Sequence, residues 1–280
     1  MVMTELDDYL RLALAEDVGA GDVTSLATIG EGSMSKAKLI VKGEGVLAGV
    51  MVAERIFGLV DDSLRLSVFI NDGAFVGVGD VAFYVEGSAR SILMAERLVL
   101  NCMQRMSGIA TKTNGLVRLL GGYKTRLLDT RKTTPNFRVF EKMAVGIGGG
   151  MNHRFGLYDM MMIKDNHIDF AGGISNAIGA AIAYRELFGK DLKIEVEARN
   201  IVEVEEILSV GGINRIMLDN FSIDDLKIAV EMIGDKYETE ASGNITGDTI
   251  LDYARCGVDY VSMGALTHSY SSLDMSLKAY

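Results

Sequence analysis

The second half of the chain, from Tyr123 onward, repeats a short β-rich run, a polar loop and an amphipathic tract. Neighbouring parallel strands need a crossover segment between them, so this repeat predicts parallel βα units. Six such strands in one region favour a barrel over an open sheet. The predicted strands are Arg126–Asp129, Met161–Lys164, Leu192–Glu197, Arg215–Asp219, Glu238–Ser242 and Tyr260–Gly264, and an amphipathic tract follows each of them except the first two.

The first half has a different pattern, with helices expected at Thr4–Asp17 and Val50–Leu59 and short strands around the second of them. A long helical tract follows at Ala89–Leu120, and we expect it to break near Ser107–Gly108. The predicted antiparallel strands are Ser35–Lys42, Leu64–Ile70 and Val81–Glu86.

These two patterns predict two domains, with fold class α/β. The N-terminal domain covers 1–109 and includes the connecting helix, and the barrel domain covers 110–280, whose last residues can pack back on the first domain. A content of 49% hydrophobic and 24% charged residues is ordinary for a globular protein. No apolar run reaches the roughly 18 residues of a membrane span, and the acidic, amphipathic start is unlike a signal peptide. We therefore expect a cytoplasmic protein without a membrane partner.

The two cysteines, Cys102 and Cys256, lie in apolar or helical patterns and lack CxxC or metal-binding spacing. We expect both to be buried free thiols, as in a protein from a reducing compartment.

Polar or small residues stand at or just after the carboxyl end of every predicted strand of the second half. In a βα barrel this rim holds the active site, whereas structural need alone would explain one or two such charges as solvated loop positions. The rim residues are Asp129 with Arg131 and Lys132, Lys164, Glu197, Asp219, Ser242 with Gly243, and Gly264.

Positive charge is concentrated in one segment of an acidic chain. Between Lys124 and His167 there are 8 Lys/Arg against 4 Asp/Glu, which leaves 20 against 34 in the rest of a chain whose net charge is -10. A surface for nucleic acid or membrane lipid would need a basic excess spread over one face. The segment instead predicts a site for a small, multiply charged anion, with Arg131, Lys132 and Arg154 as donors to carboxylates or phosphates.

Carboxylates on two neighbouring strands add a second kind of chemistry. Glu195 and Glu197 have period-two spacing and point the same way, together with Lys193. Glu197 and Asp219 could hold Mg²⁺ through oxygen ligands or water, or bind sugar hydroxyls. A buried ion pair between Lys193 and a glutamate is the alternative.

Glycine-containing loops complete the candidate site. Gly148–Gly150 permits either close backbone approach to a ligand or a flexible turn. The late loops at Ser242–Asn244 and Gly264–Ser269 resemble the usual phosphate pocket of a barrel. No Ser/His/Asp order, HExxH helix, Walker loop or GxGxxG motif stands out. All three histidines fall in these loop motifs: His153, His167 and His268.

Long motifs in a fixed order give these residues a family resemblance. The chain is similar to the quinolinate phosphoribosyltransferases, the decarboxylating nicotinate-nucleotide pyrophosphorylases, over nearly its whole length. The motifs that carry the resemblance are EDVGAGDVTS (16–25), AERLVLN (95–101), LLDTRKTTP (127–135), EKMAVGIGGGMNHRFGLYDMMMIKDNHI (141–168), IEVEA (194–198), MLDNF (217–221), EASGNI (240–245) and DYVSMGALTHS (259–269).

The resemblance implies an N-terminal α/β sandwich with an antiparallel sheet and an incomplete α/β barrel of about seven strands. It implies a homodimer in which one subunit completes the other's active site. The implied reaction joins quinolinate to phosphoribosyl pyrophosphate with Mg²⁺ and gives nicotinate mononucleotide, pyrophosphate and CO₂, on the route to NAD.

The resemblance also assigns roles to individual residues. Arg131, His153, Arg154 and Lys164 would surround the two carboxylates of quinolinate. Lys132 would act in catalysis at substrate or diphosphate, and Arg97 would come from the partner subunit. Glu197 and Asp219 would act in catalysis at the ribose and hold Mg²⁺ with pyrophosphate. The residues implied for phosphate binding are Ser242, Gly243, Gly264 and His268.

One departure and two alternatives stay open at this point. Asn136 stands where the family commonly has glycine, and asparagine is the next best residue for a positive φ. A barrel enzyme of another class could use Lys164 or Lys132 as a Schiff-base nucleophile. A non-catalytic anion-binding relative, or a paralogue of the group beside molybdate-transport genes that acts on another acceptor, is the second alternative.

Overall fold

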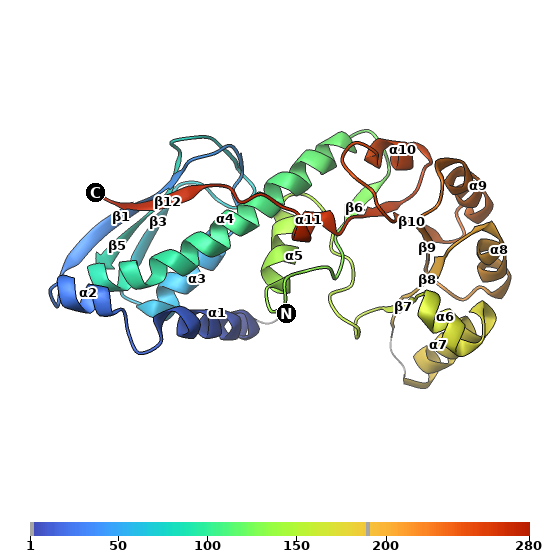
Figure 1. The fold of residues 1–280 in the computed structure, drawn as a ribbon, viewed down its shortest axis with the longest axis horizontal. Coiled ribbons are helices and arrows are strands. Elements are labelled where there is room, and N and C mark those ends of the chain that lie inside the picture. Colours follow the sequence, from blue (N-terminus) through green and yellow to red (C-terminus); the bar gives the residue numbers. More distant parts are fainter. Residues whose placement is uncertain (1–2, 189–190) are drawn as a thin grey trace. The chain divides into compact units, whose positions relative to one another are not determined.

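The computed structural model describes residues 3–188 and 191–280 and divides them into two compact units (Figure 1). The first unit contains the residues up to Asn114 together with Thr133–Gly149 and Leu266–Tyr280. The second unit contains Gly115–Lys132 and Gly150–Ala265. Each unit therefore draws on separated stretches of the chain.

The first unit is built on an antiparallel sheet of four strands within the described residues. The sheet order is β12-β1-β5-β3, so the late strand β12 lies at its edge, beside β1. This arrangement confirms the expected antiparallel sheet and places the last residues of the chain in the first unit. The strands are β1 (Met34–Val41), β3 (Arg65–Val68), β5 (Val81–Ser88) and β12 (Met275–Ala279), and a separate pair is formed by β2 (Gly45–Val46) and β4 (Phe75–Val76).

Helices of the first unit begin where the sequence supplies a cap or an apolar stripe. Asp22 caps the short α2 because its carboxylate accepts hydrogen bonds from the backbone N–H groups of Thr24 and Ser25 at 3.1 Å each. Helix α3 buries Ile56 and Phe57 completely, and Phe57 packs edge-on against Phe83 of the sheet. The helices before the connecting helix are α1 (Met3–Val18), α2 (Val23–Thr28) and α3 (Val50–Val60).

The long tract after β5 forms one continuous helix, α4 (Ala89–Leu119), so the expected break at Ser107–Gly108 was wrong. Both residues serve packing instead. The Ser107 hydroxyl accepts a hydrogen bond from the Ala48 N–H at 2.8 Å, and a Cβ on Gly108 would collide with the backbone of Ser271. Glycine is needed at this position because another segment of the first unit approaches the helix closely.

A further helix, α5 (Arg138–Ile147), also belongs to the first unit and was not expected from the sequence. It buries Glu141, whose carboxylate pairs with the guanidinium of Arg105. Its end is Gly148, where a Cβ would lie 2.5 Å from the carbonyl oxygen of Ala110. Close packing inside the first unit thus accounts for Gly148, the first residue of the triple glycine.

The second unit is a parallel sheet of six strands within the described residues, in the order β6-β11-β10-β9-β8-β7. Next to the edge strand β6, the backbone at Met151 extends the sheet by one isolated parallel bridge to Leu128. This is the expected incomplete α/β barrel. The strands are β6 (Arg126–Leu128), β7 (Met161–Ile163), β8 (Ile194–Ala198), β9 (Arg215–Asp219), β10 (Glu238–Ser242) and β11 (Tyr260–Ser262).

Helices follow the strands of this unit, and the first two strands are no exception. Strand β7 leads into α6 and α7, and the chain after β6 leads into α5, so the expectation that these strands lacked amphipathic successors was wrong. Asn200 and Ser222 cap α8 and α9 by accepting from backbone N–H groups at 3.0 and 3.1 Å. The helices are α6 (Asp165–Ala171), α7 (Ile174–Phe188), α8 (Ile201–Val210), α9 (Ile223–Ile233) and α10 (Ile250–Arg255). The short α11 (Ala265–His268) begins at the last residue of this unit, and its other residues belong to the first unit.

Alternate residues of the strands separate an apolar layer from a charged one. Val196, Ile216 and Ala241 are fully buried and belong to the face that the helices cover. The opposite face carries charged residues, of which Glu195 and Glu240 are fully buried. Both expected free thiols are also confirmed as buried, and burial raises the pKa of the Cys102 thiol to about 12. Among the helices of the described chain, none combines the length and apolar character that crossing a bilayer requires.

Candidate functional site

Strand register places the polar side chains of the second unit on one face of its sheet. Glu195 pairs with Arg215 and Glu197 with Met217, and Asp219 pairs with Ser242 at the strand ends. Residues in register on parallel strands point to the same side, and so do residues two positions apart on one strand. Glu195, Glu197, Asp219 and Ser242 therefore share one face, as the period-two spacing predicted for the two glutamates.

Lys164 and Glu197 meet on this face. The register of β7 and β8 pairs Ile163 with Val196, so its next step brings Lys164 opposite Glu197. The Lys164 Nζ donates to Glu197 Oε2 at 2.8 Å, and the glutamate is only 6% exposed. A charge-assisted hydrogen bond thus joins the two predicted site residues, and Lys193, the alternative partner, is exposed.

The segment after the triple glycine is held against β6 by Asp129. The carboxylate of this fully buried residue accepts a hydrogen bond from the His153 N–H at 2.8 Å, and its own N–H donates to the Met151 carbonyl at 3.1 Å. Two points of attachment fix the backbone that carries His153 and Arg154. The role of Asp129 is thus to position this segment.

The ring of His153 enters a buried cluster of charges. Its Nε2 lies 3.1 Å from Glu195 Oε2 and 3.2 Å from Glu240 Oε2, and its Nδ1 accepts a hydrogen bond from the Arg154 N–H at 2.7 Å. Arg215 donates to Glu240 at 2.9 Å and stacks on the ring of Tyr260. Two buried carboxylates thus share one imidazole and one guanidinium, and the guanidinium also donates to Glu238 at 3.0 Å.

Burial and pairing act in opposite directions on these groups. Burial lowers the pKa of His153, but the hydrogen bonds and charges of Glu195 and Glu240 outweigh it and raise that pKa to about 9. Burial and the charge of Glu240 raise the pKa of Glu195. The pKa of Glu240 falls despite its burial, because His153 and Arg215 stabilise the carboxylate. A second proton on His153 Nδ1 would displace the Arg154 amide, so the charge of the ring and the backbone at Arg154 are linked.

The guanidinium groups of Arg131 and Arg154 are further candidates for binding an anion. Burial and the charge of Arg131 lower the pKa of Arg154, whereas the charges of Glu195 and Asp159 act in the opposite direction. Arg154 also donates to the Met160 carbonyl at 3.3 Å. Lys132, next to Arg131, is exposed, and its N–H is held by the Thr130 hydroxyl at 3.0 Å. Guanidinium and ammonium groups concentrated in one segment suit a ligand with several carboxylates or phosphates.

Asp219 and the loop of Ser242 and Gly243 lie at the ends of β9 and β10. The Asp219 carboxylate is half-buried, and its Oδ2 accepts a hydrogen bond from the side chain of Asn220 at 2.7 Å. Gly243 has a φ of 101°, which an L residue rarely adopts. Gly264, after β11, is also half-buried in this unit.

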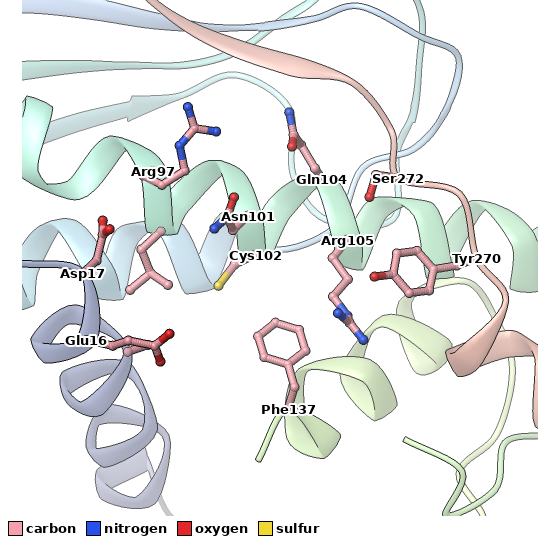
Figure 2. A pocket seen from close by; sticks show the side chains of 12 residues that line it. Glu16, Asp17, Arg97, Asn101, Cys102, Gln104, Arg105, Phe137, Tyr270 and Ser272 are labelled. Carbon is pink, nitrogen blue, oxygen red and sulfur yellow. The ribbon is translucent and has the colours of Figure 1, made fainter. Parts of the chain in front are cut away.

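The remaining two predicted site residues belong to the first unit. His268 is exposed at the end of α11, where its Nδ1 lies 2.7 Å from the Ser269 hydroxyl. Arg97 is exposed on α4 and lines a cavity of about 480 Å³, which Figure 2 shows together with Arg105, also on α4, and Glu16 from α1. Arg105 stacks over the rings of Phe137 and Tyr270 at 5.0 and 4.8 Å.

Sequence reasoning missed Glu240 and Arg215 as members of the site. Both lie on predicted strands at positions that share the face of Glu195, so extending the period-two argument to β9 and β10 would have found them. Asn136 was expected to adopt a positive φ, and its φ of 60° confirms this.

Comparisons with known proteins agree with one another over the whole chain. The family models for the N-terminal and C-terminal domains of quinolinate phosphoribosyl transferase match residues 22–107 and 109–278. A quinolinate phosphoribosyltransferase [decarboxylating] of Nicotiana tabacum is 46% identical, over 98% of this chain and 82% of its own length. A chloroplastic nicotinate-nucleotide pyrophosphorylase [carboxylating] of Oryza sativa is also 46% identical, over 98% of this chain and 77% of its own.

The solved structure of the nicotinate-nucleotide pyrophosphorylase from Francisella tularensis superposes with a TM-score of 0.92 at 39% identity, covering 100% of this chain and 98% of that one. The chain belongs to the quinolinate phosphoribosyltransferase family.

The two family models of the quinolinate phosphoribosyltransferases meet inside α4, between residues 107 and 109. The two compact units divide the chain differently. Two segments pack in the first unit although they lie within the range of the C-terminal family model or just beyond it: Thr133–Gly149 and Leu266–Tyr280. Helix α5 and strand β12 are thus the parts by which the C-terminal sequence builds the N-terminal unit.

Proposed function

We propose that this protein transfers the phosphoribosyl group of phosphoribosyl pyrophosphate to quinolinate with loss of CO₂, in the synthesis of NAD. The ring nitrogen of quinolinate forms a bond to C1 of the ribose as the bond to pyrophosphate breaks. The carboxylate at ring position 2 then leaves as CO₂, and the ring carbon takes up a proton. The product is nicotinate mononucleotide. Membership of the family and the concentration of cations between Lys124 and His167 support this proposal most directly.

On the acceptor side, Arg131, Arg154 and Lys164 bind the two carboxylates of quinolinate. Their positive charges are concentrated in an acidic protein, so they attract a dianion and favour the bound state. Lys132, exposed beside Arg131, contacts substrate or diphosphate and stabilises the negative charge that develops on the leaving group.

His153 was expected to contact quinolinate directly. Both of its ring nitrogens face protein groups, and the residue is 8% exposed. We therefore assign it to the quinolinate side as the residue that anchors the segment of Arg154 between Asp129 and two buried glutamates, and that adds positive charge behind that guanidinium.

On the donor side, Glu197 and Asp219 face the ribose, and their negative charges stabilise the oxocarbenium character at C1 in the transition state. They also fit Mg²⁺, because both offer carboxylate oxygens from neighbouring strands on one face of the sheet. Mg²⁺ supplies charge neutralisation on the diphosphate when it is bound. The proposed phosphate ligands are Ser242, Gly243, Gly264 and His268.

Arg97 leads to the proposal of a shared site. It is exposed on α4 and belongs to the first unit, whereas the acceptor-side cations belong to the second. We propose a homodimer in which Arg97 of one subunit reaches the barrel of the other.

The buried free thiols suit a reducing compartment such as the cytoplasm, which is the location we propose.

A Schiff-base mechanism at Lys164 is less well supported. Its amino group already donates to Glu197 at 2.8 Å, and a lysine nucleophile must instead be uncharged and free to attack.

The direct test is an assay of the purified protein with Mg²⁺ and phosphoribosyl pyrophosphate. Quinolinate should give nicotinate mononucleotide and CO₂, detected by chromatography and by release of label from the 2-carboxylate. Nicotinate, which lacks that carboxylate, is the matched control and should react poorly. Absence of product, or equal use of nicotinate, would contradict the proposal.

A further inference from the structure

Asn220 joins two parts of the donor side that come from different strands. It follows Asp219 directly at the end of β9, and its side-chain N–H donates to Asp219 Oδ2 at 2.7 Å. Its backbone N–H donates to the Ser242 carbonyl at 2.9 Å, and its side-chain oxygen accepts from the Asn244 amide at 3.2 Å. One residue thus contacts the carboxylate and the loop after β10.

The local backbone is adapted to this contact. Asn220 has a φ of 55° and Asn244 a φ of 49°, so both lie in the left-handed region that asparagine tolerates better than most residues. A Cβ on Gly243 would collide with the side chain of Asn220 and lie 2.9 Å from its backbone nitrogen. Glycine at 243 is therefore required by Asn220 as well as by its own φ of 101°.

We propose that Asn220 is a positioning residue that sets the Asp219 carboxylate and the Ser242–Asn244 loop at a fixed separation, so that a ribose hydroxyl and a phosphate of one ligand bind together. The proposal rests on the proposed function for the identity of that ligand. The amide donates to one oxygen of Asp219 through a single hydrogen bond. The same side chain holds the loop through its other end, so Asp219 and the loop move as one body.

Asparagine combines two properties that few residues supply at this position. Its amide offers a donor and an acceptor at once, and its backbone accepts a positive φ. Aspartate keeps the backbone and the acceptor but puts a second negative charge beside Asp219. Glycine keeps the backbone and removes both side-chain contacts. These two substitutions separate the side chain's role from the conformation of the chain.

The experiment measures kcat and the KM of each substrate for Asn220→Gly and Asn220→Asp, with Asn136→Gly as control. Asn136 has a comparable φ of 60° and lies in an exposed loop of the first unit. Asn220→Gly should raise the KM of phosphoribosyl pyrophosphate about tenfold, the loss expected for one or two hydrogen bonds, and change the KM of quinolinate less than about twofold. Asn220→Asp should be worse, and Asn136→Gly should match the wild type.

Calorimetric binding of ribose 5-phosphate, in the absence of metal, provides a readout that does not depend on turnover. Asn220→Gly should bind it about tenfold more weakly than the wild type, since hydroxyl and phosphate contacts are no longer held together. In an Asp219→Asn background the same substitution should cost less, because its main partner has changed.

The outcomes are distinguishable from those of the proposed function. If the wild type makes no nicotinate mononucleotide, the activity is wrong, yet the binding comparison still decides the role of Asn220. If Asn220→Gly has unchanged affinity for ribose 5-phosphate and an unchanged KM for phosphoribosyl pyrophosphate, the inference is overturned. A fall in kcat alone, or an equal rise in both KM values, would also contradict it, because either would indicate a general structural effect.

Discussion

Lys164 donates a 2.8 Å hydrogen bond to Glu197. The lysine proposed to bind quinolinate and the carboxylate proposed to face the ribose are therefore in contact when no ligand is bound. Each group holds the other in a defined rotamer. Binding of a dianionic acceptor must then share Lys164 between its carboxylate and Glu197.

Lys164→Ala should therefore lower kcat/KM for quinolinate by on the order of 10–100-fold, as expected from losing a hydrogen bond to a charged group. Lys193→Ala removes an exposed lysine just before β8, the strand that carries Glu197, and should have little effect. Steady-state kinetics with quinolinate as the varied substrate provide the measurement. Equal effects of the two substitutions would contradict the placement of Lys164.

Removing Arg215 should destabilise the second unit. Arg215→Ala leaves Glu240 buried without its guanidinium partner, and breaking a buried ion pair from one side costs about 3–5 kcal/mol. Arg199→Ala, which breaks an i,i+4 pair with Glu203 whose arginine is exposed to solvent, should cost less than about 1 kcal/mol. Urea unfolding followed by circular dichroism compares them, and similar midpoints for the two variants would count against a buried network.

The pH dependence of stability should reveal His153. Its pKa is about 9 in the fold against an ordinary value of 6.5, so folding favours the protonated ring. That stabilisation is complete below about pH 6.5 and is lost as pH rises through about 9; its size is on the order of 3 kcal/mol. Unfolding midpoints of the wild type should fall across this window, whereas His153→Gln should show a flatter profile. Parallel profiles would refute the raised pKa.

Mixing inactive variants tests the shared site. Arg97→Ala and Lys164→Ala should each keep at most about a tenth of wild-type activity, and mixing with subunit exchange should raise this to about a quarter, since half of the dimers are mixed and each has one intact site. The control is a mixture of Arg154→Ala with Lys164→Ala. Both residues belong to one barrel, so every site stays damaged and no activity should return. Recovery in the control mixture, or none in the first under proven exchange, would exclude the shared arrangement.

Chelation of divalent ions should abolish activity, and added Mg²⁺ should restore it. Asp219→Asn removes one negative charge from the proposed ligand pair and should raise the Mg²⁺ concentration for half-maximal activity about tenfold. Asp224→Asn changes an exposed aspartate in the first turn of α9 and should leave this concentration unchanged. A titration with Mg²⁺ checks both, and full activity after chelation would rule out the ion.

Local sequence patterns predicted the six strands of the second sheet and three of the four strands of the first, because a β-rich run and its flanking loop lie together in the chain. They did not predict β12, whose place beside β1 depends on a contact between the two ends of the chain. They did not predict α5, whose buried Glu141 reads as a surface charge until Arg105, far away in sequence, is placed beside it. The same limit applies to Arg215 and Glu240, whose burial depends on pairing between strands. The sequence was enough to assign individual charges to the rim. Which charges pair with one another could be known only from the strand register.

Strand β12 pairs with β1 over Ala37–Val41 and Met275–Ala279. The sheet of the first unit is therefore completed by residues that the ribosome adds only after it has made the barrel. During synthesis, β1 leaves the ribosome with one edge uncovered and keeps it so until translation of the other unit has finished. Contacts that span such a long stretch of chain also form slowly, because the intervening loop must close first. The nascent protein thus has an exposed strand edge for most of its time on the ribosome, and we expect this interval to be its period of greatest risk of aggregation.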